Sequence, residues 1–471
     1  MLKFTLPLFA LLALLFAPAL AFAAGQPHLP ADLAITWIIP FVGMLLSIAL
    51  GQLLVPHFWH HNFGKVAAFW GLAFLVPCGL FFGFGTAAFL ALDTLLLDYL
   101  PFILLLVALF TVAGGIRLKG SLVGSPAVNV GILAVGTALA SVMGTTGAAM
   151  LLIRPLLRAN KHRQYRVHQV VFFIFLVGNI GGSLSPLGDP PLFLGFLKGV
   201  SFFWALIHLL AKTLFVSAIL LALCFLLDTY LYKKEGSPVP PGEAAGRGEK
   251  IGIEGAVNCG LLFCVILNTL LSGQWHGRIV PVFGVPMEMQ NIVRDVIYIL
   301  IAAISWVSTG LEARKRNDFS WAPVIEVAKL FIGIFISMIP CLAILKAGSE
   351  GSLAGLVNLA SDAAGNPIPA AYFWITGSLS GFLDNAPTYL VFFNTAGGNA
   401  AKLMEEVNTL AAISAGAVFM GALTYIGNAP NFMIRAIAVE QGVGMPGFFG
   451  YMAWSFGILV PVFILVTLIF F

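Results

Sequence analysis

The sequence predicts an all-α polytopic membrane protein made of two inverted repeats. Composition is the first reason, because hydrophobic residues fill 60% of the 471 positions and charged residues only 9%. A water-soluble domain of this length could not cover its surface with so few charges, so we expect a chain that crosses a lipid bilayer several times. The formal net charge of +4 gives no reason to expect a nucleic-acid partner.

An internal repeat is the second reason. The first copy consists of Thr145 and Thr146 followed by Gly188 and Asp189, and the second of Asp384 and Asn385 followed by Gly427 and Asn428. The two parts lie 44 positions apart in both copies (189 − 145 and 428 − 384), and one offset of 239 positions (384 − 145) relates the copies. Helix breakers and polar side chains inside apolar sequence are typical of secondary transporters with a central binding site.

The first repeat is expected to cover residues 34–232. Its spans are predicted at 34–55, 66–90, 99–117, 168–199 and 202–232. The apolar stretch 126–157 has basic residues before and after it, so the positive-inside rule places both of its ends on the cytoplasmic side. We therefore predict a re-entrant hairpin there, covered by other helices, and a break within the span at 168–199.

The second repeat is expected to cover residues 251–471. Its spans are predicted at 252–272, 288–310, 322–347, 408–441 and 447–470, with a hairpin at 370–397 and a break in the span at 408–441. The basic residues at 314–316 then lie in the cytoplasm, so the second half runs in the opposite orientation. Residues 1–24 resemble a signal peptide or N-terminal anchor, and the polar segment 233–250 is a cytoplasmic linker.

The breaks and the hairpin tips supply the expected site. Each break contains proline, which lacks an N–H group and clashes with the preceding helical turn. Such a break is stable in lipid only where its freed polar groups line a cavity or bind a ligand. Oxygen donors suit Na⁺, and the N-terminal ends of half-helices suit an anion, so both ligand classes stay open.

Two carboxylates favour a cation. Asp189 lies in the first break and Asp384 at the second hairpin tip. Placing an aspartate at the centre of a membrane costs roughly 2.5 to 3.5 kcal/mol, so we expect both to hold Na⁺ or carry protons, with Thr146 and Asn385 as further Na⁺ ligands. The alternative is that both aspartates cap the ends of broken helices.

The segments GNIGGSLSPLGDPP, FLDNAPT and TYIGNAPNFM carry a resemblance to a known family. The chain resembles the ion transporter superfamily, in particular its NhaD-type sodium/proton antiporters and its citrate transporters. This resemblance implies a homodimer in which each protomer has a scaffold domain and an elevator-type transport domain. It assigns ion or substrate binding to Thr145, Thr146, Ser185, Gly188, Asp189, Asp384, Asn385, Thr388, Thr424, Gly427 and Asn428.

These observations predict a sodium/proton antiporter of the bacterial inner membrane, in which ion and proton compete at Asp189 and Asp384. No cofactor beyond the coupling ions Na⁺ and H⁺, and no catalytic residue, is expected. The main alternative is a Na⁺- or H⁺-coupled symporter of citrate or another small carboxylate, with Arg435 and the half-helix N-termini holding the anion. An intramembrane aspartyl protease is a poor fit because Pro186 stands where its motif needs glycine. A passive channel is less consistent with broken inverted repeats.

Overall fold

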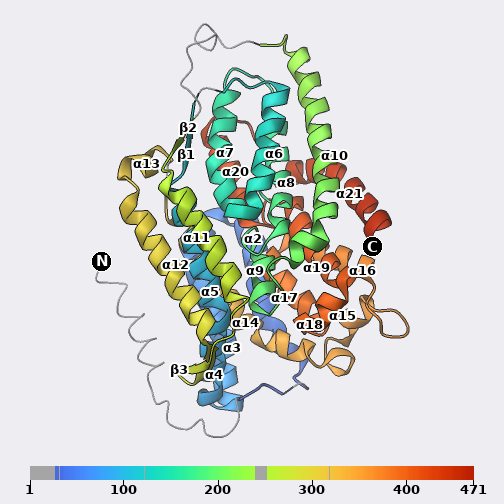
Figure 1. The fold of residues 1–471 in the computed structure, drawn as a ribbon. Coiled ribbons are helices and arrows are strands. Elements are labelled where there is room, and N and C mark those ends of the chain that lie inside the picture. The colour runs from blue at the N-terminus through green and yellow to red at the C-terminus, as the bar shows by residue number, and fades with distance from the viewer. Residues whose placement is uncertain (1–26, 31, 121, 239–251, 318) are drawn as a thin grey trace.

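The computed structural model of the protein describes residues 27–30, 32–120, 122–238, 252–317 and 319–471 (Figure 1). These residues are predominantly helical, and nine of the helices they form are long and apolar enough to cross a membrane. The prediction of a helical membrane protein with several spans is confirmed to that extent. The predicted leader or anchor at 1–24 and most of the predicted linker at 233–250 lie outside the described residues.

The first half of the chain consists of two groups of helices. The first group is η1 (Ile35–Ile38), α2 (Ile39–Leu54), α3 (Pro56–Phe82), α4 (Phe84–Thr94), the π-helical turn η2 (Leu95–Tyr99) and α5 (Leu100–Ala113). The second group is α6 (Pro126–Met143), α7 (Thr145–Ala159), α8 (Val167–Leu176), the 3₁₀ turn η3 (Ile180–Leu184), α9 (Pro190–Leu197) and α10 (Trp204–Lys234).

The second half has the same general order. Its first helices are α11 (Val257–Ser272), α12 (Met289–Ser308), the short α13 (Leu311–Arg316), α14 (Ala322–Leu345), the turn η4 (Gly348–Glu350) and α15 (Ala354–Leu359). The remaining ones are α16 (Pro369–Phe382), α17 (Asn385–Thr395), α18 (Ala400–Glu405), α19 (Val407–Met420), the 3₁₀ turn η5 (Gly421–Leu423), α20 (Ala429–Glu440) and α21 (Phe448–Phe470).

Two small antiparallel strand pairs complete the fold, and the sequence analysis anticipates neither. Strand β1 (Arg117–Lys119) pairs with β2 (Gly252–Glu254), and β3 (Ile279–Val282) forms a hairpin with β4 (Val285–Glu288). The first pair joins the end of α5 to the start of α11, and Arg117 lies 3.0 Å from Glu254 across it. The two halves of the chain are therefore linked at this end by backbone pairing.

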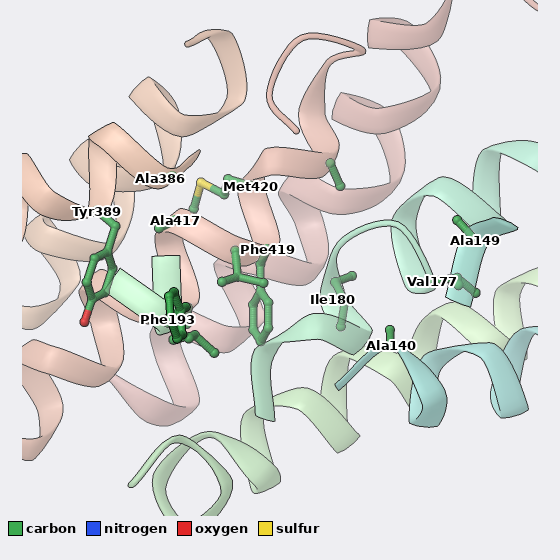
Figure 2. Close-up of a cluster of buried hydrophobic side chains, with 14 of the residues drawn as sticks. Ala140, Ala149, Val177, Ile180, Phe193, Ala386, Tyr389, Ala417, Phe419 and Met420 are labelled. Atoms are coloured by element: carbon green, nitrogen blue, oxygen red, sulfur yellow. The ribbon is translucent and has the colours of Figure 1, made fainter. Parts of the chain in front are cut away.

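The helices pack as two neighbouring bundles. Helices α2 to α5 pack with α11, α12 and α14, whereas α6 to α10 pack with α16, α17 and α19 to α21 (Figure 1). Contacts of α5 with α7 and α9, and of α14 with α17, join the two bundles. Figure 2 shows part of the second bundle's apolar core, where Ile180 of η3, Phe193 of α9 and Phe419 of α19 are buried with Tyr389 of α17.

A buried polar cluster holds the base of the α6–α7 hairpin. The carboxylate of Asp228 on α10 accepts hydrogen bonds from Asn129 on α6 (2.7 Å) and from Arg163 (2.8 Å), and lies 2.9 Å from the His168 ring on α8. Arg163 also pairs with Glu235, directly after α10. A buried charge is stable only when it is paired and hydrogen-bonded, so this cluster fixes the hairpin to α8 and α10.

Two boundaries differ from prediction. The predicted spans 66–90 and 99–117 are instead α3, which ends before Gly83 (φ 91°), and one continuous helix from Phe84 to Ala113. Asp98 lies within this continuous helix, where Lys198 compensates its charge at 2.6 Å. Helix α10 includes Lys233 and Lys234, the first two residues of the predicted linker.

Candidate functional site

The first hairpin tip is a sharp corner between α6 and α7. It turns at Gly144, whose φ of 81° lies in the left-handed region that favours glycine. Helix α7 then begins at Thr145, whose backbone N–H donates to the Gly188 carbonyl at 2.9 Å. The tip is thus attached directly to the first break.

The first break separates η3 from α9. Ser185 is extended there, and its hydroxyl donates to the Ser141 carbonyl of α6. Gly188 crosses so close to Gly182 that a Cβ at position 188 would lie 2.1 Å from the Gly182 carbonyl oxygen. Asp189 is extended in the N-cap position of α9, and Pro190 starts that helix. Its side chain caps no N–H group of α9, so the carboxylate is free to serve the site.

The second break, between η5 and α20, has the same local structure. Thr424 corresponds to Ser185, is also extended, and donates to the Gly381 carbonyl at 2.6 Å. A Cβ at Gly427 would lie 2.5 Å from the Gly421 carbonyl oxygen, and Asn428 occupies the N-cap position of α20. The similarity predicted from the motif spacing therefore extends to hydrogen bonds and close backbone approaches.

The second hairpin tip differs from the first. Asp384, between α16 and α17, accepts a hydrogen bond from the Ala386 N–H at 3.0 Å, and the Thr388 hydroxyl donates to the Asp384 carbonyl at 2.7 Å. Asp384 thus caps α17, the arrangement of the capping alternative. In the described residues it makes no hydrogen bond to Asp189, although both carboxylates lie in the same region.

All four elements meet at the carboxylate of Asp189, which is 2% exposed. It accepts hydrogen bonds from Thr145 of the first tip (3.1 Å), from Asn428 of the second break (2.9 Å) and from Asn385 of the second tip. Among the described residues, no Lys or Arg nitrogen lies within 4.0 Å of it. The site is a buried acidic group surrounded by neutral donors.

One polar atom beside this carboxylate has no partner. The side-chain oxygen of Asn385 is buried and makes no hydrogen bond within the described structure, although the amide nitrogen of the same residue donates to Asp189. An unpaired buried oxygen costs about 1 to 3 kcal/mol. A small cation bound between it and Asp189 would satisfy both groups, since Na⁺ prefers such hard oxygen ligands. The two oxygens, from Asp189 and Asn385, are therefore suitable ligands for a sodium ion.

A cavity of about 60 Å³ reaches the site from the side of α5. It is lined by Thr145 and Thr146, by Gly188 and Asp189, and by an apolar wall that includes Leu109. This volume holds a few water molecules by order of magnitude, so a hydrated small ion fits better than a large anion in this conformation. Thr146 and Gly188 therefore line the cavity, whereas Ser185, Thr388, Thr424 and Gly427 support the backbone around it.

Sequence reasoning missed four supporting residues. Ser141 and Ser380, which are related by the 239-position offset, donate to the Gly181 and Ala417 carbonyls. The offset could have found this pair. Asn179 and Asn431, which are fully buried, hydrogen-bond each other across the two breaks at 2.8 Å. Their counterparts under the offset are valine and leucine, so the repeat gave no signal for them.

The remaining candidate, Arg435, lies on α20 beside the second break. Its guanidinium carbon is 5.0 Å from the centre of the Tyr425 ring, and its Nε is buried without a hydrogen-bond partner in the described structure. Helix α20, which carries this cation, packs against α7 and α8.

Comparison with protein families gives a match over almost the whole chain. A family described as “Putative citrate transport” matches residues 30–471, which include both hairpins and both breaks. No curated protein matches the sequence at a significant level.

Proposed function

The chain belongs to the citrate-transport family, and on this basis we propose that it carries citrate or a related small carboxylate across a membrane, coupled to Na⁺. The family match favours this alternative over the sodium/proton antiport that the sequence analysis puts first. One observation supports Na⁺ as the coupling ion. Both tips and both breaks converge on Asp189, beside the unpartnered Asn385 oxygen.

The cation explains how an acidic site accepts an anion. Asp189 alone would repel a carboxylate, but a bound Na⁺ neutralises it and leaves the neighbouring donors available. Helix α7 begins at the cavity, so its positive N-terminal end and the Thr146 hydroxyl favour an anionic group there. Arg435, as a cation near the second break, is the proposed second anchor for the carboxylate groups.

We assign the wider architecture on the same basis. The two packing groups correspond to a scaffold of α2 to α5, α11, α12 and α14, and to an elevator-type transport domain that contains both hairpins. The shared structure of the two breaks supports inverted repeats over 34–232 and 251–471. We also propose that the protein forms a homodimer in the bacterial inner membrane.

A reconstituted-vesicle assay tests the function. Uptake of labelled citrate is measured under an inward Na⁺ gradient, with choline or a pH gradient as the comparison. Wild-type protein should take up citrate only with Na⁺, and Asp189→Asn should lower that uptake on the order of 100-fold. Asp362→Asn is the matched control, because Asp362 is an exposed aspartate in the loop before α16. Uptake driven by the pH gradient alone would mean that the coupling ion is H⁺ and not Na⁺. If citrate is taken up under neither gradient, the proposal is rejected.

Sodium/proton antiport is the second candidate, because the buried Asp189 carboxylate and the unpartnered Asn385 oxygen are both oxygen ligands that suit a small cation. It predicts that Na⁺ releases protons from the vesicles without citrate, as reported by an internal pH dye. It also requires both aspartates, so Asp384→Asn should stop exchange. If Asp384 only caps α17, asparagine should replace it with little loss, since asparagine caps helices as well as aspartate.

A further inference from the structure

The amide of Asn428 has more hydrogen-bond acceptors than hydrogens. Its nitrogen lies 2.9 Å from Asp189 Oδ1, 3.2 Å from Asn179 Oδ1 and 3.2 Å from the Gly178 carbonyl. An amide NH₂ group carries two hydrogens, so it cannot make a full two-centre hydrogen bond to each of these three acceptors at once. Asn428 is 2% exposed, and Asn179 is fully buried.

Asn179 is held firmly in its own position. It precedes η3 in the first break, and its amide nitrogen donates to the Ile174 carbonyl and to Asn431 Oδ1, both at 2.8 Å. Asn431 in turn donates to the Gly421 and Thr424 carbonyls of the second break, both at 2.9 Å. The Asn179 oxygen is therefore a fixed acceptor that connects the two breaks.

We propose that Asn179 is a positioning residue for cation loading, which offers the Asn428 amide a second acceptor when Na⁺ occupies the Asp189 carboxylate. A cation at Asp189 repels the N–H groups that point at the same oxygen. The Asn428 amide then satisfies its hydrogens at Asn179 and Gly178, so no buried N–H group is left unpaired. The hydrogen bonds of Asn428 in the second break thereby depend on whether Na⁺ is bound at Asp189 in the first break.

This inference rests on the proposed Na⁺ coupling at Asp189 and deepens it. Position 179 is a useful place to test it, because its counterpart under the 239-position offset is Val418. Valine and threonine have nearly the same shape, but only threonine offers an oxygen acceptor. Asn179→Val and Asn179→Thr therefore separate the loss of the acceptor from the change in packing.

The experiment measures Na⁺ binding to the purified full chain, not transport. The midpoint of thermal unfolding is followed as Na⁺ replaces choline at constant ionic strength, which yields an apparent Na⁺ affinity. Asn179→Val should bind Na⁺ about tenfold more weakly than wild type, as expected for one buried N–H group left unpaired. Asn179→Thr should recover at least half of the lost binding free energy.

Asn268→Val is the matched control. Asn268 on α11 is also a buried amide and donates to the Arg294 carbonyl at 2.9 Å, away from the site. It should lower the unfolding midpoint without changing the Na⁺ affinity. If Asn179→Val does not fold, Asn179→Thr alone should bind about threefold more weakly than wild type.

Three outcomes overturn the inference: wild type that does not bind Na⁺, Asn179 variants that bind it as wild type does, or an Asn268→Val variant that is weakened equally. Na⁺ binding with the expected variant pattern, but no citrate uptake in vesicles, would reject the substrate proposal and leave this inference intact.

Discussion

The two breaks have the same backbone but different side chains at the decisive position. Ser185 and Thr424 make equivalent hydrogen bonds to the facing hairpin, and Gly188 and Gly427 permit equivalent close approaches. The N-cap position of the following helix is Asp189 in the first break and Asn428 in the second, and the two side chains hydrogen-bond each other at 2.9 Å.

This comparison distinguishes the residues that shape the backbone of the site from the residue that gives the site its charge. The shared residues are hydroxyls and glycines that shape an interrupted helix, and a side chain at either glycine would collide with the backbone. The residue that differs supplies one negative charge to a centre shared by both halves. One carboxylate is enough, since a second at position 428 would face Asp189 and destabilise both charges.

Exchanging the two N-cap residues should produce the largest effect. Asp189→Asn removes the carboxylate that accepts hydrogen bonds from both hairpin tips and from the second break, and Na⁺-dependent uptake should fall on the order of 100-fold, the equivalent of about 2.7 kcal/mol. The double variant Asp189→Asn with Asn428→Asp restores one carboxylate between the same donors, and should recover at least a tenth of wild-type uptake. Initial rates of citrate uptake measure both.

The exchange has a clear control in the single variant Asn428→Asp. It places two carboxylates within hydrogen-bonding distance, so it should be at least as inactive as Asp189→Asn. A double variant no better than either single one would mean that the two breaks are not interchangeable supports.

The second largest difference is expected between the residues that anchor the two hairpins, in how much their substitution lowers the free energy of unfolding. Asp228 ties the first hairpin to α10 through charged hydrogen bonds, whereas its counterpart under the offset, Thr467, accepts only the Trp374 N–H at 2.9 Å. Asp228→Ala leaves Arg163 and His168 without their shared partner and should cost about 3 kcal/mol. Thr467→Val should cost about 1 kcal/mol. The shift of the unfolding midpoint in detergent compares them, and equal shifts would contradict the difference in anchoring.

Substitution of the glycines in the two breaks should give the third largest difference in stability. Alanine at 188 would place its Cβ 2.1 Å from a carbonyl oxygen, and alanine at 427 would place it 2.5 Å from the equivalent oxygen. Both contacts are with backbone, so Gly188→Ala should destabilise by about 3 kcal/mol and Gly427→Ala by about 2 kcal/mol. Gly260→Ala on α11 has open space around it and is the control. Its unfolding midpoint should stay within a degree or two of wild type.

The repeat in the sequence predicts most of the residues that the structure brings together around Asp189. Proline and glycine at membrane depth mark helix ends whatever surrounds them, so the breaks and tips could be placed from sequence. The role of Asp384 could not, because an aspartate that caps a helix and one that binds an ion look alike without geometry.

What the sequence could not predict depends on contacts between distant segments. Asn179 and Asn431 are 252 positions apart and lack polar counterparts, so no local or repeated pattern marks them. The strands β1 and β2 are three residues long and are separated in the sequence by helices α6 to α10 and the linker, so no local pattern marks them as a pair. The ion pair of Asp98 with Lys198 likewise joins residues 100 positions apart, and it keeps a charged residue within a continuous helix.

The smallest expected difference is between the serines that support the breaks. Ser141 donates to the Gly181 carbonyl and accepts from the Leu184 N–H at 3.0 Å, whereas Ser380 donates to the Ala417 carbonyl at 2.6 Å. Ser141→Ala should therefore cost about 2 kcal/mol, for two lost hydrogen bonds, and Ser380→Ala about 1 kcal/mol. Unfolding midpoints of both variants, with the double variant to check additivity, measure the difference. If Ser380→Ala is the more damaging, the second break relies on its serine more than its hydrogen bonds indicate, and the first break is held mainly by Asp189 and its three donors.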